Sequence, residues 1–372
     1  MIDFDVILEK IGGLGRYQVL LVAMVCYYSI PSGFNSLAPV FMNYKPEYRC
    51  KVPPIDSNFN LTENEILNLT TPVDASGAYA TCQRYGYNLS LCETDLSCVN
   101  KSAGPIQCDL GYHYDTSIFP QTVITEFNLV CDQAYLDPVA TSIYMVGVLI
   151  GSIVFGIISD KWGRKPTMIS TAVLGFAALI GTSFVHNYWL FVFCRFVVAF
   201  LGYGTYLSSF VYLLEITSNK WRTLIGVSFQ LVFAVGYMIL SGIAYYWRNW
   251  HKMNFVTGVL GLPYAVFLIF IPESPRWLFS NGKEEEGKKI SRKFAKYNKV
   301  ELDENIIWKE AEMSAEKKKV NTWRACNVAG LKPFFQHLPP LFRRKIPSRR
   351  TAELTPPLIS SGQEESESSA LK

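Results

Sequence analysis

Charge is scarce in this sequence. Asp, Glu, Lys and Arg make up 18% of its 372 residues, whereas they make up about a quarter of an ordinary soluble domain. The deficit is concentrated between Asp160 and Glu273, where long stretches carry no charge, so a single soluble globule is excluded. No short period governs the 25 glycines and 19 prolines, which excludes a fibrous or a disordered chain.

Catalytic constellations are missing as well. The four histidines are scattered without metal-ligand spacing: His113, His186, His251 and His337. The apolar segments contain no paired acids, and no phosphate-binding glycine loop is followed by Lys-Ser or Lys-Thr, so an intramembrane enzyme and an ATP-driven pump have no support. The sequence therefore predicts no enzyme, no cofactor, no metal and no nucleic-acid partner.

Six apolar runs are each long enough to cross a bilayer as a helix, which takes about 20 residues. They cover residues 17–41, 138–158, 167–185, 189–213, 223–246 and 253–271. The first run is too long for a removed signal peptide and lacks a small-residue cleavage site, so we predict a retained span after a cytosolic N-terminus over 1–16. Pro31, Gly33 and Asn35 interrupt its second half, which is tolerated where neighbouring helices satisfy the backbone.

The basic residues predict an orientation, because short cytosolic loops are rich in Lys and Arg. The loop 159–165 carries three of them, the loop 215–222 carries two, and the segment after Pro272 carries 20 of the chain's 35. The loop 186–188 carries none. The loop 248–252 carries two, which disagrees with the orientation that the other loops indicate. We therefore predict a multi-pass plasma-membrane protein with both termini in the cytosol and residues 42–137 outside the cell.

The polar block 42–137 has the composition of an extracellular loop. It holds all the Asn-x-Ser/Thr sequons of the chain, and we predict glycosylation at Asn60, Asn68, Asn88 and Asn100. It also holds six of the nine cysteines: Cys50, Cys82, Cys92, Cys98, Cys108 and Cys131. An even number outside the cell predicts three disulfides in one of 15 connectivities, the alternative being free thiols in a loop. The remaining Cys26, Cys194 and Cys326 are expected to be reduced.

The most specific motif runs from Gly156 to Lys165 and reads GIISDKWGRK. A turn this short must reverse two helices at the membrane face. Gly156 lets helix backbones approach closely, Asp160 can cap a helix start, and Arg164 and Lys165 can hold the loop and pair with acids. The alternative is a generic basic loop. A second motif, PESPRWL, closes the sixth run from Pro272 onward, where two prolines stop the helix.

These stretches resemble a known family of transporters. GIISDKWGRK resembles the signature of the major facilitator superfamily, and PESPRWL resembles the segment after the sixth helix of sugar-porter-like facilitators. Residues 34–50 (FNSLAPVFMNYKPEYRC) and 124–131 (ITEFNLVC), with the long cysteine-rich loop, resemble solute carrier family 22, the organic cation, carnitine and organic anion transporters. The resemblance covers about residues 1–320 and is nearest to the organic cation/carnitine branch.

The resemblance implies an all-α membrane protein of six transmembrane helices, like one half of a major facilitator bundle with a large extracellular loop. Spans two to six would occupy 138–272, and a cytosolic helical segment would occupy 273–319. Residues 320–372 then have the composition of a disordered tail. Such facilitators bind substrate between two six-span halves. A lone half leaves its cavity face to lipid, so we expect a second half or a homodimer as partner.

The resemblance also implies residues that gate the transporter. The cytosolic gate would be held by Gly156, Asp160, Gly163, Arg164, Lys165, Glu215 and Arg222. Glu215 and Arg222 bracket the next cytosolic turn, and their ion pair would resemble the family's latch, the alternative being a solvated pair worth less than about 1 kcal/mol. Arg195, inside the fourth run, is a further gating candidate that either faces the bundle interior and a partner or snorkels to the outer interface.

Six residues are candidate substrate contacts: Asn35, Tyr203, Tyr206, Phe229, Gln230 and Phe233. Polar and aromatic side chains at helical spacing inside a bundle suit a cavity that holds a cation against π faces, although most residues of that kind only pack. By the resemblance, the five in the fourth and fifth runs face the family's central cavity. Tyr203 stands where some cation transporters place a Lys, which leaves the charge preference open.

The leading hypothesis is a transporter that moves small organic cations or carnitine-like zwitterions across the lipid bilayer by alternating access. The alternative is a non-transporting membrane binding protein, or a regulator of a full-length relative.

Overall fold

The computed structural model describes residues 3–58, 61–74, 77–87, 99–301, 308–311, 313–314 and 316. Residues 8–302 form one compact unit, and residues 1–7 with 303–372 form another. A short helix, α1 (Phe4–Lys10), lies in the predicted N-terminal segment. In the second unit the Asp3 N–H donates to the Ala311 carbonyl (3.1 Å). The predicted tail over 320–372, with Cys326 and His337, lies outside the described residues.

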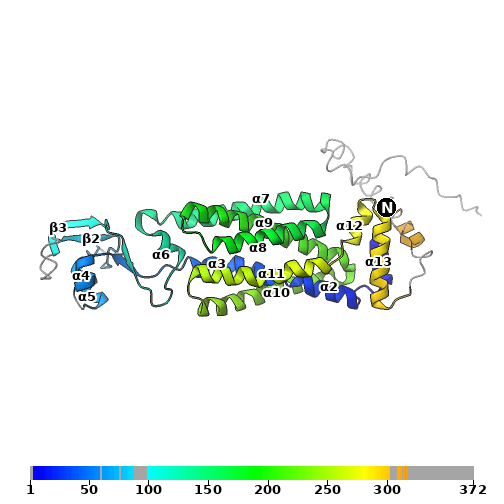
Figure 1. Ribbon diagram of the computed structural model, residues 1–372, viewed down its shortest axis with the longest axis horizontal. Helices are drawn as coiled ribbons and strands as arrows, with labels where there is room; N and C mark the ends of the chain where they lie inside the picture. Colours follow the sequence, from blue (N-terminus) through cyan, green and yellow to red (C-terminus); the bar gives the residue numbers. More distant parts are fainter. Residues whose placement is uncertain are drawn as a thin grey trace, which may run out of the picture. The chain divides into compact units, whose positions relative to one another are not determined.

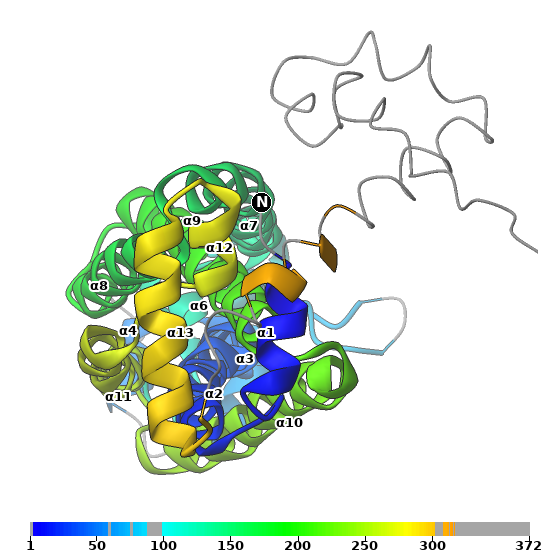
Figure 2. The same cartoon turned by 90° about the vertical axis from the view of Figure 1, so that its right-hand side faces the viewer.

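Among the described residues, six helical segments are long and apolar enough to cross a membrane, which confirms the predicted six-span class. They are α2 (Arg16–Cys26) with α3 (Ser29–Met42), α7 (Leu136–Trp162), α8 (Arg164–Thr182), α9 (Tyr188–Ile216), α10 (Asn219–Tyr246) and α11 (Trp250–Phe270). They lie side by side as one bundle (Figures 1 and 2), in which α7 and α8 both pack against α9, α10 packs against α3, and α11 packs against α8.

The first span is broken between Cys26 and Ser29, where α2 ends and α3 begins. Pro31 accounts for the position, because a proline has no N–H and its ring clashes with the carbonyl four residues earlier, that of Tyr27. Further along α3, a Cβ on Gly33 would lie 2.7 Å from the Phe233 carbonyl oxygen of α10. A neighbouring helix therefore packs closely against the interrupted half of this span.

Close contact between α7 and α9 depends on a different glycine from the one predicted. A Cβ on Gly147 would lie 2.8 Å from the Phe196 carbonyl oxygen, so the two backbones approach closely there. A Cβ on Gly156 would meet only one side-chain carbon, at 3.8 Å, so the predicted close approach at Gly156 is wrong. At that end of α7 the ring of Phe155 packs against Gly204 of α9, where a Cβ would overlap the ring.

The outer face of α7 carries an apolar stripe. Met145, Leu149, Ile153 and Ile157 recur every fourth residue, and their side chains are 57–60% exposed. Four large apolar side chains on one exposed helix face are unfavourable in water but favourable against acyl chains. The stripe is thus suited to an apolar surrounding, as the six-span class requires.

The described residues between 43 and 130 form a lobe at one end of the bundle (Figure 1). Its described elements are β1 (Tyr48–Cys50), α4 (Pro53–Asn58), α5 (Glu63–Thr70), β2 (Gln83–Tyr87), β3 (Val99–Gln107), β4 (Tyr112–Tyr114) and α6 (Val123–Phe127), and the short helix η2 (Cys131–Gln133) follows. β1 pairs antiparallel with β4, with Arg49 opposite His113, and β2 pairs antiparallel with β3. These two small sheets are an addition to the predicted helical architecture.

Disulfides and a buried cation hold the lobe together. Cys50 is bonded to Cys108 and Cys82 to Cys131, whereas Cys92 and Cys98 lie outside the described residues. Cys26 and Cys194 are free thiols. The Arg49 side chain is 3% exposed and donates to the carboxylates of Asp56 (2.7 Å) and Glu63 (2.8 Å). Its hydrogen bond to Glu63 lowers the pKa of that carboxyl below its ordinary value.

Two helices follow the bundle, α12 (Pro275–Ser280) and α13 (Glu284–Asn298), inside the segment predicted to be helical. One face of α13 is buried through Phe294 and Ala295. At its end, Asn298 accepts a hydrogen bond from the Tyr17 N–H (3.0 Å) and donates to the Gln18 side chain (2.7 Å). α13 is thereby attached to the start of α2.

Candidate functional site

A single residue, Gly163, joins α7 to α8. Its φ of 113° lies in the region that side-chain-bearing residues avoid, and a Cβ there would overlap the Glu273 carboxylate. The turn therefore requires glycine at this point of the GIISDKWGRK motif. Because glycine has no side chain, α8 begins at Arg164 without a cap from its own N-terminal neighbour.

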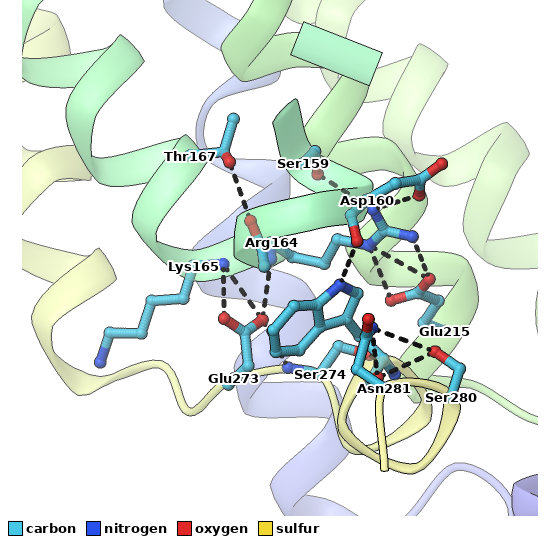
Figure 3. A network of polar contacts seen from close by, with 12 residues as sticks. Ser159, Asp160, Arg164, Lys165, Thr167, Glu215, Glu273, Ser274, Ser280 and Asn281 are labelled. Atoms are coloured by element: carbon cyan, nitrogen blue, oxygen red, sulfur yellow. Dashed lines mark hydrogen bonds and ion pairs between the residues drawn. The ribbon is translucent and has the colours of Figure 1, made fainter. Parts of the chain in front are cut away.

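Arg164 is the centre of a polar network at this turn (Figure 3). Its guanidinium donates to Asp160 Oδ1 (2.7 Å), to Ser159 Oγ (3.1 Å) and to both carboxylate oxygens of Glu215 on α9, the shortest contact being 2.8 Å. The side chains of Arg164 and Glu215 are 9% and 12% exposed, whereas that of Asp160 is 70% exposed. The buried pair thus connects the α7–α8 turn to the end of α9.

Glu273, from the PESPRWL motif, supplies the missing cap of α8. Its Oε1 accepts from the backbone N–H of Arg164 (2.9 Å) and of Lys165 (3.2 Å), and from the Ser274 N–H (2.9 Å). A carboxylate at a helix N-terminus is favourable, because the first N–H groups have no partner within the helix and the helix dipole is positive there. The two motifs therefore form one structural unit.

The opposite helix end at this turn is also capped by the second motif. Trp277 Nε1 of α12 donates to the carbonyl of Asp160, in the last turn of α7 (2.8 Å). Lys165 Nζ donates to the Ile269 carbonyl at the end of α11 (3.1 Å). Trp277 of α12 thus contacts the end of α7, and Lys165 of α8 contacts the end of α11.

The partners of Glu215 and Arg222 differ from the predicted latch. Glu215 forms its ion pair with Arg164, a partner that the sequence analysis did not predict. Arg222 Nε donates to the Leu214 carbonyl (3.1 Å). Arg222 also lines an open groove of about 490 Å³ between α9 and α10, whose wall is Phe210, Leu214, Arg222, Thr223, Gly226, Val227 and Gln230.

Arg195 lies inside the bundle rather than at an interface. It is 6% exposed, and its guanidinium lies 4.7 Å from the ring centroid of Tyr144 on α7, in a cation–π contact. Its Nη1 is buried and has no hydrogen-bond partner among the described residues. Of the two predicted environments, the structure has the interior one, with an aromatic face as the partner.

An aromatic cluster surrounds Tyr206 on neighbouring faces of α9 and α10. Its ring centroid lies 5.6 Å from that of Tyr203, 5.2 Å from that of Phe229 and 6.3 Å from that of Phe233. Gln230 Nε2 donates to the Tyr206 hydroxyl (2.7 Å). Five of the six predicted substrate contacts are therefore brought together. Tyr203 and Gln230 are exposed, and Tyr206 and Phe233 are partly exposed.

Phe229 and Asn35 depart from the predicted arrangement. Phe229 is completely buried, so its predicted place on an open cavity face is wrong; its ring packs beneath Tyr206 and against Phe210. Asn35 is half-buried and lines a separate cavity of about 10 Å³ with Tyr28 and Gly202, among others. That volume holds at most one water molecule.

Two histidines predicted to be scattered lie together. His186 and His251 both lie within hydrogen-bond distance of the Glu126 carboxylate, at 2.9 Å and 2.7 Å. Sequence spacing gave no signal, because the three residues come from separate segments.

Two of the four predicted glycosylation sites lie among the described residues, and both Asn68 and Asn100 are exposed. Asn60 and Asn88 lie outside the described residues.

Comparisons with known proteins agree with this architecture. Residues 110–339 match the family described as "Sugar (and other) transporter". The organic cation transporter protein of Drosophila melanogaster is 31% identical over 327 residues, covering 88% of this chain and 58% of the relative. Human solute carrier family 22 member 13 is 32% identical over 311 residues, covering 82% and 56%. Mouse solute carrier family 22 member 4 is 33% identical over 315 residues, covering 81% and 55%.

Solved structures match the fold. The xylose transporter XylE from E. coli, in a partially occluded inward-open conformation, aligns with a TM-score of 0.50 and 16% identity, covering 87% of this chain and 64% of that one. The chain spans about half the length of the curated relatives it matches.

Proposed function

Because the chain belongs to the sugar (and other) transporter family of the major facilitator superfamily, with solute carrier family 22 members among its relatives, we propose that it works in membrane transport of small organic cations or zwitterions. This family consists of transporters rather than enzymes. Carnitine-like solutes, which carry a quaternary ammonium and a carboxylate, are the proposed zwitterionic substrates.

The aromatic cluster around Tyr206 is the observation that carries this proposal. An ammonium held over Tyr203, Tyr206 or Phe233 gains cation–π attraction without the desolvation cost of a fixed counter-charge. The Gln230 amide, which holds the Tyr206 hydroxyl, offers a neutral polar contact beside the rings. This combination favours organic cations and zwitterions over metal ions or phosphates.

The network around Arg164 is the proposed cytosolic gate. It gathers the ends of four helices through short polar contacts rather than through apolar packing. Basic loops at this end support a cytosolic location, and the sequons and disulfides of the lobe support an extracellular location for the other end. The proposed location is the plasma membrane, with both termini in the cytosol.

Alternating access needs a second six-helix unit for this one to rock against. We propose that a second copy of the chain, or the matching half of a relative, provides it and covers the α9–α10 face.

Uptake measurements test the transport proposal. Cells expressing the chain, alone or with a full-length relative, are given labelled carnitine and a labelled model cation. We expect uptake above the vector control, reduced at least ten-fold by Tyr206→Ala and much less by Tyr206→Phe, which keeps the ring. Tyr246→Ala is the matched control, because Tyr246 is 80% exposed at the far end of α10. Absence of uptake in both settings would defeat the proposal.

The second candidate is a regulator without transport activity of its own. Affinity purification of the chain from cells that also express a full-length relative distinguishes the two functions. Stable co-purification, with the relative's uptake altered and no uptake by the chain itself, would support the regulator.

A further inference from the structure

Three segments far apart in the sequence converge at the lobe end of the bundle, away from α12 (Figure 1). Glu126 comes from α6, His186 from the turn between α8 and α9, and His251 from the first turn of α11. Each offers one metal-binding atom, and these atoms all lie within 4.8 Å of one another. The Glu126 carboxylate lies between the two rings, 2.9 Å from His186 Nδ1 and 2.7 Å from His251 Nε2.

The surrounding hydrogen bonds prepare these atoms for a metal. His251 Nδ1 lies 2.8 Å from the Ser183 carbonyl oxygen, which can only accept, so Nδ1 donates there and fixes the ring. His251 Nε2 lies 2.7 Å from Glu126 Oε2, so a metal ion would take the place of the hydrogen bond between these two atoms. Trp250 Nε1 (2.6 Å) and Gln121 Nε2 (3.2 Å) donate to Glu126 Oε2 and hold the carboxylate. Metal-binding histidines and carboxylates are fixed in this way in proteins.

The donor set of this cluster fits a metal ion. The two imidazole rings have centroids 5.1 Å apart, and the carboxylate of Glu126 contacts both. Two imidazoles and one carboxylate are typical zinc ligands, whose bonds of about 2.0–2.2 Å place tetrahedral ligand atoms about 3.3–3.5 Å apart. The separations of 2.7–4.8 Å bracket that value, so the ligand atoms must move relative to one another by about 1.5 Å at most.

We propose that Glu126, His186 and His251 bind Zn²⁺ and that the ion pins α6 of the lobe to the α8–α9 turn and to α11. His186 is 76% exposed, which gives the ion access from solvent and leaves room for water as a fourth ligand. The proposal does not depend on transport, and its test does not measure transport.

The test uses the purified full chain in detergent, with an affinity tag free of histidine and after chelator treatment. ZnCl₂ should raise the melting temperature of the wild type, and Co²⁺ should give the visible absorption of tetrahedral coordination. His186→Ala, at an exposed position, should fold normally and lose both signals, with metal affinity weakened at least 10–100-fold. His186→Cys should restore them, because a thiolate binds zinc.

His113→Ala is the matched control, because His113 lies in the lobe on β4 and outside the cluster. It should behave as the wild type. Wild-type protein that shows no zinc-dependent shift would overturn the proposal. So would His186→Ala protein that keeps the zinc response, or a His113→Ala protein that loses it.

Discussion

Replacing Arg164 with Gln tests whether buried charge pairing holds the α7–α8 turn. The Glu215 side chain is 12% exposed, so the substitution leaves a nearly buried carboxylate without its partner, at a cost of about 3–5 kcal/mol. Asp160 is 70% exposed, so Asp160→Asn removes a surface pair worth only about 0–1 kcal/mol. The backbone N–H of residue 164 still meets Glu273 in both variants, so the cap of α8 is preserved.

Thermal unfolding of the purified chain in detergent measures the difference. If 1 kcal/mol corresponds to about 2 °C, we expect Arg164→Gln to lower the Tm by about 6–10 °C and Asp160→Asn by about 2 °C at most. The double variant Arg164→Gln/Glu215→Gln removes both buried charges and should melt above Arg164→Gln alone. The reasoning would be refuted if the double variant lost as much Tm as Arg164→Gln and Glu215→Gln lose together when each is made alone. Equal losses of Tm for Arg164→Gln and Asp160→Asn would also refute it.

Three further predictions use the same purified chain. Gly147→Ala should lower the Tm through overpacking of about 1–3 kcal/mol, because its Cβ would lie 2.8 Å from a carbonyl oxygen of α9, whereas Gly156→Ala should not; equal effects would contradict the α7–α9 contact. The Arg49–Glu63 pair lowers the pKa of Glu63 below 4.5, so its stabilisation is complete above pH 4.5 and is lost as the pH falls through the lowered pKa. Pulse proteolysis of the lobe at decreasing pH should detect this loss of stability, and the loss should be smaller in Glu63→Gln. If Glu63→Gln shows the same dependence of stability on pH as the wild type, the Arg49–Glu63 pair is not the cause. Glycosidase treatment should increase gel mobility, with one step absent in Asn68→Gln, and unchanged wild-type mobility would contradict an extracellular lobe.

The six spans could be predicted from sequence because the constraint that creates them is local. A bilayer demands about 20 consecutive apolar residues per helix, and each run satisfies that demand by itself. The break in the first span has a local cause as well, because the Pro31 ring clashes with the Tyr27 carbonyl, although Pro39 is accommodated inside α3. The aromatic cluster was predicted in part, because Tyr203 and Tyr206 on one helix and Phe229 and Phe233 on the next recur at helical spacing.

Contacts between distant segments could not be predicted in this way. Glu273 caps a helix whose first residue lies 109 positions earlier, and no spacing rule connects the two. Gly156 was misassigned because the glycine that meets a neighbouring helix depends on where the helices cross. Glu126, His186 and His251 are far apart in the sequence and lie together only in the folded structure, so no spacing pattern connects them.

The disulfides of the lobe have a practical consequence for imaging. Cys50 follows the end of α3 closely, and Cys131 stands in η2, just before α7, so covalent bonds anchor the lobe near both helices. An antibody fragment that recognises the lobe would consequently act as a rigid fiducial for electron microscopy, and its tilt would report directly on reorientation of the bundle.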